Sequence, residues 1–257
     1  MHVVILAGGR GVRLRPFTSA LPKPLVPIGE EYAILDIILQ QLRAYGFTRA
    51  TLAVGHLSPL IRAFVGDGSR WAIDVDYNEE SAPLSTIGPL FSIRDRLPEH
   101  FLVMNGDVLT TLNFADVLQQ HSMSGAALTV ATAPRIVKID FGVLEARRGQ
   151  IIAFREKPLL SYLVSMGVYG LSRETIAKYP EGMSFGFDEL VLDLLAQEEY
   201  PAIFEHDGYW LDIGRPDDYD EANLHFDEIR AQLIPSGGLA VGPQLVASRE
   251  HSRRGTR

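Results

Sequence analysis

The sequence predicts an α/β fold in which a mostly parallel, mixed β-sheet is flanked by helices. Two observations carry this prediction. In the first half of the chain, short apolar runs alternate with segments whose apolar residues recur at helical spacing, as in a parallel sheet with right-handed crossovers. In the second half, several short strand-like segments follow one another with only short turns between them, which indicates a mixed or antiparallel region of the sheet.

The first expected strand is the fully apolar run from Val3 to Leu6, which ends in a glycine loop and is typical of a buried parallel strand. The first expected helix runs from Ala33 to Tyr45, and Gly46 stands where a C-cap glycine belongs. The remaining expected strands are Thr51 to Val54, Phe101 to Met104, Ala126 to Ala131, Phe141 to Glu145, Ile151 to Phe154 and Ser165 to Tyr169. Further helices are expected around Ile61 to Val65, Asp188 to Gln197 and Asp217 to Ile229.

The chain has 257 residues, of which 46% are hydrophobic, so it can bury a sizeable core. We expect one domain over residues 1–230 and a C-terminal extension over 231–257, whose polar and basic last ten residues form a flexible tail. A net charge of -8 argues against nucleic acid as a partner. The chain has no cysteine, no apolar run long enough to span a membrane and no recognisable leader, so a cytoplasmic location is expected.

The segment from Leu6 to Thr18 (LAGGRGVRLRPFT), with Pro22 to Pro27 (PKPLVP), carries the strongest chemical signal. Glycines after a strand let backbone N–H groups approach a phosphate or a base. The order of residues is neither a P-loop nor a dinucleotide fingerprint. Arg10, Arg13, Arg15 and Lys23 add cations, so polyphosphate is the natural ligand. The alternative is a solvated basic turn.

Three later motifs are weaker when taken alone. Asn105-Gly106-Asp107 follows an expected strand, where a carboxylate could hold magnesium, although this triplet is also a common turn. Glu156-Lys157 could bind a sugar hydroxyl and a phosphate, or could be a surface pair. Asp212 lies in an apolar run, where either a metal or hydrogen bonds must compensate its burial.

Together and in this order, the motifs resemble those of the sugar-1-phosphate nucleotidylyltransferases, over Val3 to about Asn223. The resemblance implies a Rossmann-like, GT-A-like nucleotide-diphospho-sugar transferase architecture, a nucleoside triphosphate and a sugar 1-phosphate as substrates, and Mg²⁺ as cofactor. Within the family, the sequence most resembles the mannose-1-phosphate guanylyltransferase-like members, which implies GTP and a mannose- or hexose-like 1-phosphate as substrates.

The resemblance also implies roles for individual residues. Arg13, Lys23 and Asp107 would be catalytic, and Asp107 and Asp212 would hold the metal ion. The sugar phosphate would be bound by Asn105, Glu156, Lys157 and Gly167. The nucleotide would be bound by Leu6, Ala7, Gly8, Gly9, Gly11, Arg13, Glu80, Ser85 and Gly88.

Three positions depart from the family pattern. Val12 replaces a threonine, Ser85 replaces a glycine beside the base, and Ser165 replaces an asparagine near the sugar. Base and sugar selection therefore stay open. Alternatives are a thymidylyl-, uridylyl- or cytidylyltransferase, an enzyme acting on a heptose or cyclitol phosphate, a non-catalytic sensor of nucleotide or sugar phosphate, and a related glycosyltransferase. A homodimer is possible.

Overall fold

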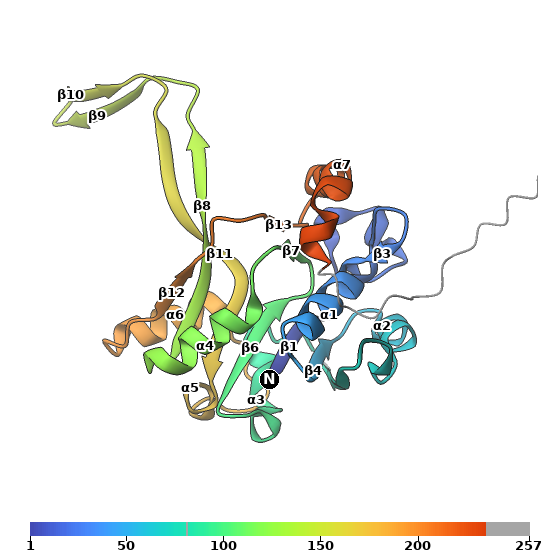
Figure 1. Ribbon diagram of the computed structural model, residues 1–257. Coiled ribbons are helices and arrows are strands. Elements are labelled where there is room, and N and C mark those ends of the chain that lie inside the picture. The colour runs from blue at the N-terminus through green and yellow to red at the C-terminus, as the bar shows by residue number, and fades with distance from the viewer. Residues whose placement is uncertain (81, 235–257) are drawn as a thin grey trace, which may run out of the picture.

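A seven-stranded mixed β-sheet forms the centre of the computed structural model, which describes residues 1–80 and 82–234 (Figure 1). The strand order is β12-β8-β11-β6-β1-β4-β5. The neighbours β6, β1, β4 and β5 run parallel, whereas β11 is antiparallel to both β6 and β8. The strands are β1 His2–Ala7, β4 Arg49–Val54, β5 Asp74–Glu79, β6 His100–Asn105, β8 Leu128–Lys138, β11 Leu159–Ser172 and β12 Ala202–Glu205.

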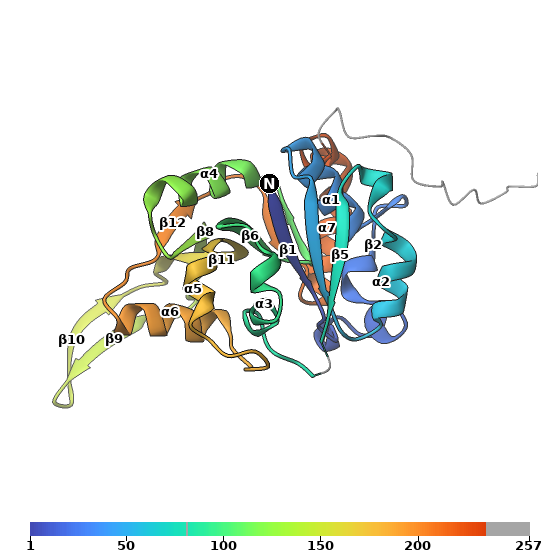
Figure 2. The same cartoon turned by 90° about the horizontal axis from the view of Figure 1, so that it is seen from below.

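Helices cover both faces of the sheet (Figure 2). Alternate residues of a strand point to opposite faces, so the apolar central strands contribute side chains to two separate cores. Val3 and Ile5 belong to a core with side chains from α1, α2, α4 and α7, whereas Val4 and Val103 belong to a second core with α3, α5 and α6. The helices are α1 Ile34–Ala44, α2 Ser58–Val65, α3 Gly88–Phe91, α4 Phe114–Ser124, α5 Arg173–Ala177, α6 Phe187–Ala196 and α7 Pro216–Leu233.

Three two-stranded sheets and several 3-10 turns complete the described chain. The small sheets pair β2 Pro27–Ile28 with β3 Tyr32–Ala33, β7 Val108–Thr110 with β13 Trp210–Asp212, and β9 Val143–Arg147 with β10 Gln150–Arg155. The 3-10 turns are Val12–Leu14, Phe17–Ser19, Lys23–Leu25, Ser69–Trp71 and Arg94–Arg96.

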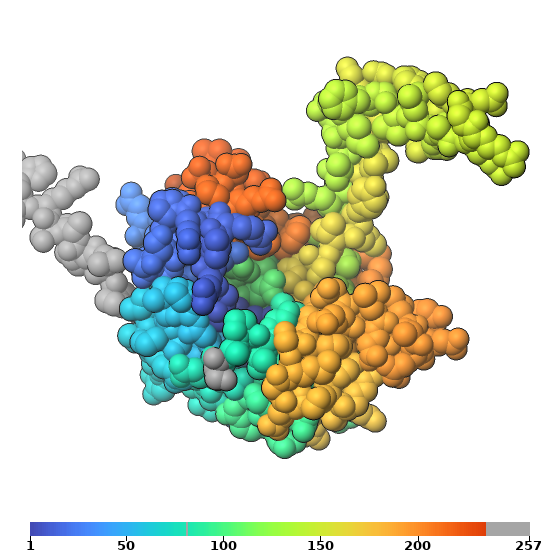
Figure 3. Space-filling model, turned by 180° about the vertical axis from the view of Figure 1, so that it is seen from behind, coloured from blue at the N-terminus to red at the C-terminus, as the bar shows by residue number. Residues whose placement is uncertain are grey.

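A long β-ribbon projects from the body, and we call residues 134–164 the arm (Figures 1 and 3). Its base is the continuation of β8 and β11 beyond the sheet, which stay paired from Ser165 opposite Thr132 to Leu159 opposite Lys138. Its end is the hairpin β9–β10. A break in register between Ser165 and Tyr169 marks the point where β11 leaves the sheet.

The structure confirms the predicted mixed α/β sheet and the presence of every expected strand and helix, with shifted ends. The expectation that residues 141–145 and 151–154 belong to this sheet was wrong, because β9 and β10 pair only with each other at the end of the arm. The largest shifts are in β8 and β11, which are much longer than predicted because their outer halves form the arm. Strand β5 and helix α4 are among the elements that were not predicted from the sequence. Helix α7 extends to the buried Leu233, so the helix crosses the boundary expected at residue 230. The predicted tail lies outside the described residues. None of the described helices is long and apolar enough for a membrane crossing.

Candidate active site

A cavity of about 430 Å³ opens where β1, β5 and β6 end, at the carboxyl edge of the parallel strands. Ligands of open α/β sheets bind at this edge. Most of the residues predicted for the nucleotide and the reacting phosphates line it together: Leu6, Ala7, Gly8, Gly9, Gly11, Arg13, Lys23, Glu80, Ser85, Asn105 and Asp107. The structure thus joins three sequence segments that lie far apart in the chain.

The glycine loop after β1 turns tightly and leaves little room for a side chain at Gly8 or Gly11. Gly11 has a φ of 57°, in the left-handed region that favours glycine, and its carbonyl oxygen accepts a hydrogen bond of 2.7 Å from the Thr18 hydroxyl. A Cβ added to Gly8 would lie 2.7 Å from Oε1 of Glu80. The loop therefore places its backbone at the cavity wall, where main-chain groups can meet a ligand directly.

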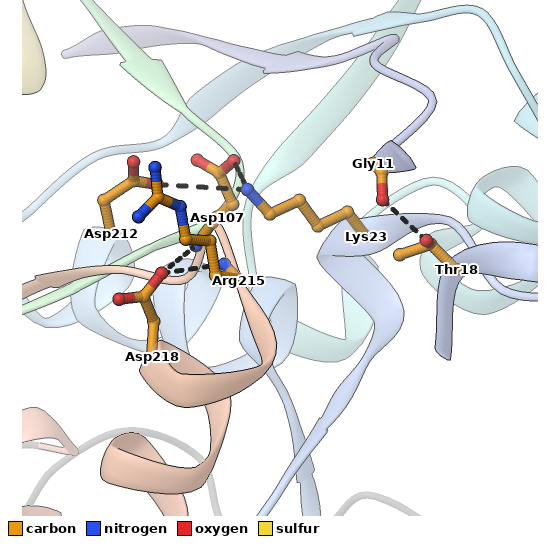
Figure 4. A network of polar contacts seen from close by, with 8 residues as sticks. Gly11, Thr18, Lys23, Asp107, Asp212, Arg215 and Asp218 are labelled. Atoms are coloured by element: carbon orange, nitrogen blue, oxygen red, sulfur yellow. Dashed lines mark hydrogen bonds and ion pairs between the residues drawn. The ribbon is translucent and has the colours of Figure 1, made fainter. Parts of the chain in front are cut away.

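Asp107 and Asp212 are brought together by the pairing of β7 with β13. In this antiparallel pair Asp212 lies opposite Val108, and the N–H of Ile213 donates a 3.1 Å hydrogen bond to the carbonyl oxygen of Asp107. The two residues are 105 positions apart in the sequence, so only this strand pairing makes them neighbours. Figure 4 shows both carboxylates directed toward the end of the Lys23 side chain.

The Lys23 ammonium lies between the two carboxylates. It donates a hydrogen bond to Oδ2 of Asp107, and its Nζ is 3.9 Å from Oδ1 of Asp212 (Figure 4). The Lys23 side chain is only 11% exposed, so solvent screens this cation weakly. Burial raises the pKa of Asp212, and the negative charge of Asp107 adds to the rise, while Lys23 and Arg13 oppose it.

This carboxylate pair has the donor chemistry that magnesium requires. One oxygen of Asp107 (Oδ1) and one of Asp212 (Oδ1) are buried without a hydrogen-bond partner in the described structure. Orphaned buried oxygens of this kind are costly unless a ligand satisfies them. The described residues contain no cluster of three or more metal-ligating side chains. Mg²⁺ is nevertheless commonly held by one or two carboxylates together with substrate phosphates, so the pair fits the ion.

Arg13 lies beside the turn that follows Asp212. Its guanidinium lies against Gly214, where an added Cβ would be 3.6 Å from an Arg13 nitrogen. The turn that carries Gly214 is fixed by Asp218, whose Oδ2 accepts hydrogen bonds from the N–H groups of Gly214 (3.1 Å) and Arg215 (2.7 Å) (Figure 4). Of the four predicted cations, Arg13 and Lys23 line the cavity, whereas Arg10 and Arg15 are exposed and do not.

Glu80 and Ser85 form the side of the cavity that was predicted for the base. Oε2 of Glu80 accepts a 3.1 Å hydrogen bond from the N–H of Leu84, and burial raises the pKa of Glu80. Ser85 has a φ of 65°, in the left-handed region. The glycine expected there by resemblance suits this conformation, whereas serine holds it at a cost.

Asn105 and Gly167 lie together on the side predicted for the sugar. A Cβ on Gly167, whose φ is 74°, would come within 2.6 Å of Nδ2 of Asn105. The neighbouring backbone is held by the Trp210 indole, which donates a 3.1 Å hydrogen bond to the carbonyl oxygen of Met166. Asn105 lines the cavity, and Gly167 packs behind it.

Five of the predicted site residues do not line the cavity. Asp212 and Gly167 lie just behind its wall, beside the lining residues Lys23 and Asn105. The other three lie elsewhere. Glu156 and Lys157 are exposed on the arm, which projects away from the body (Figure 1). Gly88 is buried at the start of α3, where an added Cβ would lie 2.5 Å from the carbonyl oxygen of Met183. Its small size is therefore required for packing.

Six further residues line the cavity and were not singled out for the site: Val12, Pro24, Pro83, Thr86, Gly106 and Gly214. All of them lie inside or beside the motifs that the sequence analysis had marked. Only their position in a motif could have identified them as cavity residues, since none has a side chain with obvious phosphate or metal chemistry. Gly106 illustrates the point, because a Cβ there would lie 2.9 Å from the carbonyl oxygen of Leu6.

A cationic glycine loop facing two carboxylates at the edge of an α/β sheet is a site for phosphoryl or nucleotidyl transfer. Comparison with known proteins identifies the family. Residues 2–228 match the family model described as nucleotidyl transferase. The chain belongs to this family, and its relatives are sugar-1-phosphate nucleotidylyltransferases.

Two curated relatives illustrate the similarity. The catalytic subunit beta of mannose-1-phosphate guanylyltransferase from Dictyostelium discoideum is 30% identical over 96% of this chain and 71% of its own length. The UTP–glucose-1-phosphate uridylyltransferase of Synechocystis is also 30% identical, over 95% of this chain and 68% of its own.

Two solved structures share the fold. HddC from Yersinia pseudotuberculosis, in complex with GMP-PN, is 27% identical with a TM-score of 0.68, over 88% of this chain and 99% of its own. A putative glucose-1-phosphate thymidylyltransferase from Bacillus anthracis has a TM-score of 0.69 at 21% identity, over 87% of this chain and 94% of its own, which shows the fold alone. These neighbours confirm the expected GT-A-like architecture.

Proposed function

We propose that this protein joins the nucleotidyl group of a nucleoside triphosphate to a sugar 1-phosphate and releases pyrophosphate. The observation that carries the proposal is the contact of Lys23 with Asp107 and Asp212 in a cavity walled by the glycine loop. This arrangement concentrates cations and metal-ligating oxygens where two anionic substrates would have to approach each other.

Neutralisation and alignment account for the reaction. The sugar phosphate is already ionised at neutral pH, so its oxygen can attack the α-phosphorus in line without a general base. Arg13 would hold the triphosphate, and Lys23 would stabilise the charge that develops at the reacting phosphorus. The backbone of Gly8 to Gly11 would orient the nucleotide. Asp107 and Asp212 would hold Mg²⁺, which when bound supplies further neutralisation of the phosphates.

The identity of the substrates is the finer part of the proposal. GTP and a mannose- or hexose-like 1-phosphate are favoured, because several of the similar curated proteins are named as mannose-1-phosphate guanylyltransferases and HddC was solved with GMP-PN. The Synechocystis uridylyltransferase is as similar, so UTP is the next candidate. At Ser85, on the base side, and at Ser165, near Gly167, the chain departs from the family pattern. These are the positions where we expect its selectivity for base and sugar to differ from that of its relatives. A cytoplasmic location is part of the proposal and accords with the cysteine-free composition.

The test is magnesium-dependent pyrophosphate release on a grid of nucleoside triphosphates and sugar 1-phosphates, beginning with GTP and mannose 1-phosphate. Turnover confined to one nucleotide and one sugar would establish the reaction and both substrates. The grid also needs heptose and cyclitol phosphates, because relatives differ in the sugar. No turnover with any pair, from a folded chain that binds nucleotide, would refute catalysis and favour a sensor.

A matched pair of variants separates catalysis from folding. Asp107→Asn keeps the size of the side chain but removes its charge, and we expect turnover to fall by about 10²-fold or more. Asp217→Asn makes the same change at an exposed aspartate nearby, and we expect turnover to stay the same. Equal turnover in the two variants would remove Asp107 from the mechanism.

A further inference from the structure

The arm exposes an unusual amount of apolar surface. Ten large apolar side chains on it are between 43% and 77% exposed: Ile136, Val137, Phe141, Leu144, Ile151, Ile152, Phe154, Leu159, Tyr162 and Leu163. A half-exposed side chain of this size contributes on the order of 100 Å². The arm therefore presents on the order of 1,000 Å², whereas a standard interface buries ~800 Å² per partner. Apolar surface of this extent marks an interaction site.

The arm is also basic, although the chain as a whole has a net charge of -8. Residues 134–164 carry six lysines or arginines against three acidic residues. Two of the cations are paired within the arm, Lys138 with Asp140 and Arg155 with Glu145. Arg135, Arg147, Arg148 and Lys157 form no ion pair with any described residue. A partner for the arm should therefore be apolar and acidic.

A surface of that chemistry lies on the same chain. The segment 187–207, which contains α6 and the edge strand β12 and which we call the acidic face, has seven acidic residues and neither lysine nor arginine. Its exposed apolar side chains are Leu192 (65%), Leu195 (43%), Tyr200 (75%) and Ile203 (47%). Its outer strand β12 pairs only on one side, with β8, within the described sheet. Unpaired strand edges are themselves sites of association.

The two surfaces do not cover each other within one molecule, because both stay exposed. Figure 3 shows the arm standing clear of the orange α5–α6 region. The two strands at the base of the arm remain paired without a bulge from Ser165 to Leu159, so the ribbon is continuous and holds its end away from the body. A second molecule can bring an acidic face to the arm without bending this ribbon.

We propose that the chain forms a two-fold dimer in which the arm of each copy lies on the acidic face of the other. The contact is isologous, so each copy contributes one arm and one acidic face. Apolar side chains form its centre, and the unpaired arginines of the arm meet the carboxylates of the acidic face. The occupant of the arm is thus a second copy of this chain.

Sedimentation velocity of the full chain tests this dimer. We expect the wild type to be a dimer and Ile136→Ser/Leu159→Ser to sediment as a monomer. Reversal of two charges, in Arg147→Glu/Arg148→Glu or in Glu198→Lys/Glu199→Lys, should raise the dissociation constant at least about tenfold. Combining the two reversals should restore the dimer. Leu224→Ser, which removes a 76% exposed side chain from α7, is the matched control and should stay dimeric.

Cysteine cross-linking distinguishes a second copy from the same chain, because the sequence contains no cysteine. A chain carrying Ile152→Cys is mixed with one carrying Leu195→Cys and oxidised, and pairs with Leu144→Cys or Leu159→Cys on the arm extend the search. We expect a disulfide-linked species of twice the mass. A monomeric wild type, a dimer unaffected by both the arm and the acidic-face variants, or cross-linking no greater in the mixtures than with either single-cysteine variant alone would each overturn the proposal.

Discussion

Removing the charge of Lys23 is the perturbation that bears most directly on the proposed chemistry. In Lys23→Met the new side chain keeps an unbranched apolar stem, which matters because the residue is 9% exposed and its stem packs against the glycine loop. The cation next to Asp107 and Asp212 disappears, while the packing is largely kept. The variant therefore tests electrostatics more cleanly than Lys23→Ala, which would also leave a cavity.

The expected magnitude follows from the position of the ammonium. A preorganised donor aimed at developing charge in a poorly solvated site contributes about 2.7–4 kcal/mol to the transition state, or about 10²–10³-fold in kcat. Lys23 meets this description, because its side chain is 11% exposed and its Nζ lies beside both carboxylates. We expect kcat to fall within that range, and KM for the nucleotide to rise by a smaller factor, since the ground state retains Arg13 and the loop backbone.

Steady-state pyrophosphate release is the assay, with Lys178→Met as the matched control. Lys178 is a 39% exposed lysine whose Nζ lies 3.2 Å from Oδ2 of Asp193. It does not line the cavity. The control should keep its turnover, and its free energy of unfolding should change by less than about 1 kcal/mol. If Lys23→Met stayed within a few-fold of the control while folded, the electrostatic role of Lys23 would be refuted.

Three further perturbations follow from the structure. Gly8→Ala should weaken nucleotide binding at least about tenfold with the fold retained, because its Cβ would displace Glu80; unchanged affinity by calorimetry would show that the close approach is not needed. Ser85→Gly should relieve the positive φ and stabilise the chain by up to ~1 kcal/mol in urea titrations, with altered base selectivity on the nucleotide grid; a clear loss of stability would contradict this reading. The pH dependence of stability should reveal His121. Burial, reinforced by His100, lowers the pKa of His121 from 6.5 to about 4, so the unfolded chain binds a proton that the folded chain does not. Its contribution is present in full above pH 6.5 and is lost as the pH falls toward 4. This loss of stability should amount to about 2 kcal/mol between pH 7.5 and pH 5, and His121→Gln should remove it. Burial also lowers the pKa of His2 to about 4, so a similar loss from His2 should remain in the variant.

The sequence alone determined the local parts of this protein. The apolar run of β1 and the glycines after it specify a buried strand and a tight loop, because both depend on residues within a few positions of one another. The position of Asp107 near the end of a buried strand was predictable for the same reason, since it lies two residues after the apolar strand β6. The order of the motifs was enough to indicate the family, which the comparisons show.

Only the tertiary structure decided which distant segments meet. Asp212 reaches Asp107 through the pairing of β7 with β13, and such a pairing depends on contacts between segments about a hundred residues apart. The same limit explains why three of the residues that were predicted to bind substrate do not line the cavity. The small size of Gly88 is required for packing, and Glu156 and Lys157 lie on the arm. Strand alternation cannot reveal whether a ribbon joins the sheet or leaves it, because β8 and β11 each continue as a single strand past the point where they leave the sheet. The tendency of a segment to be extended is local, but its full length and its neighbours in the sheet are properties of the whole fold.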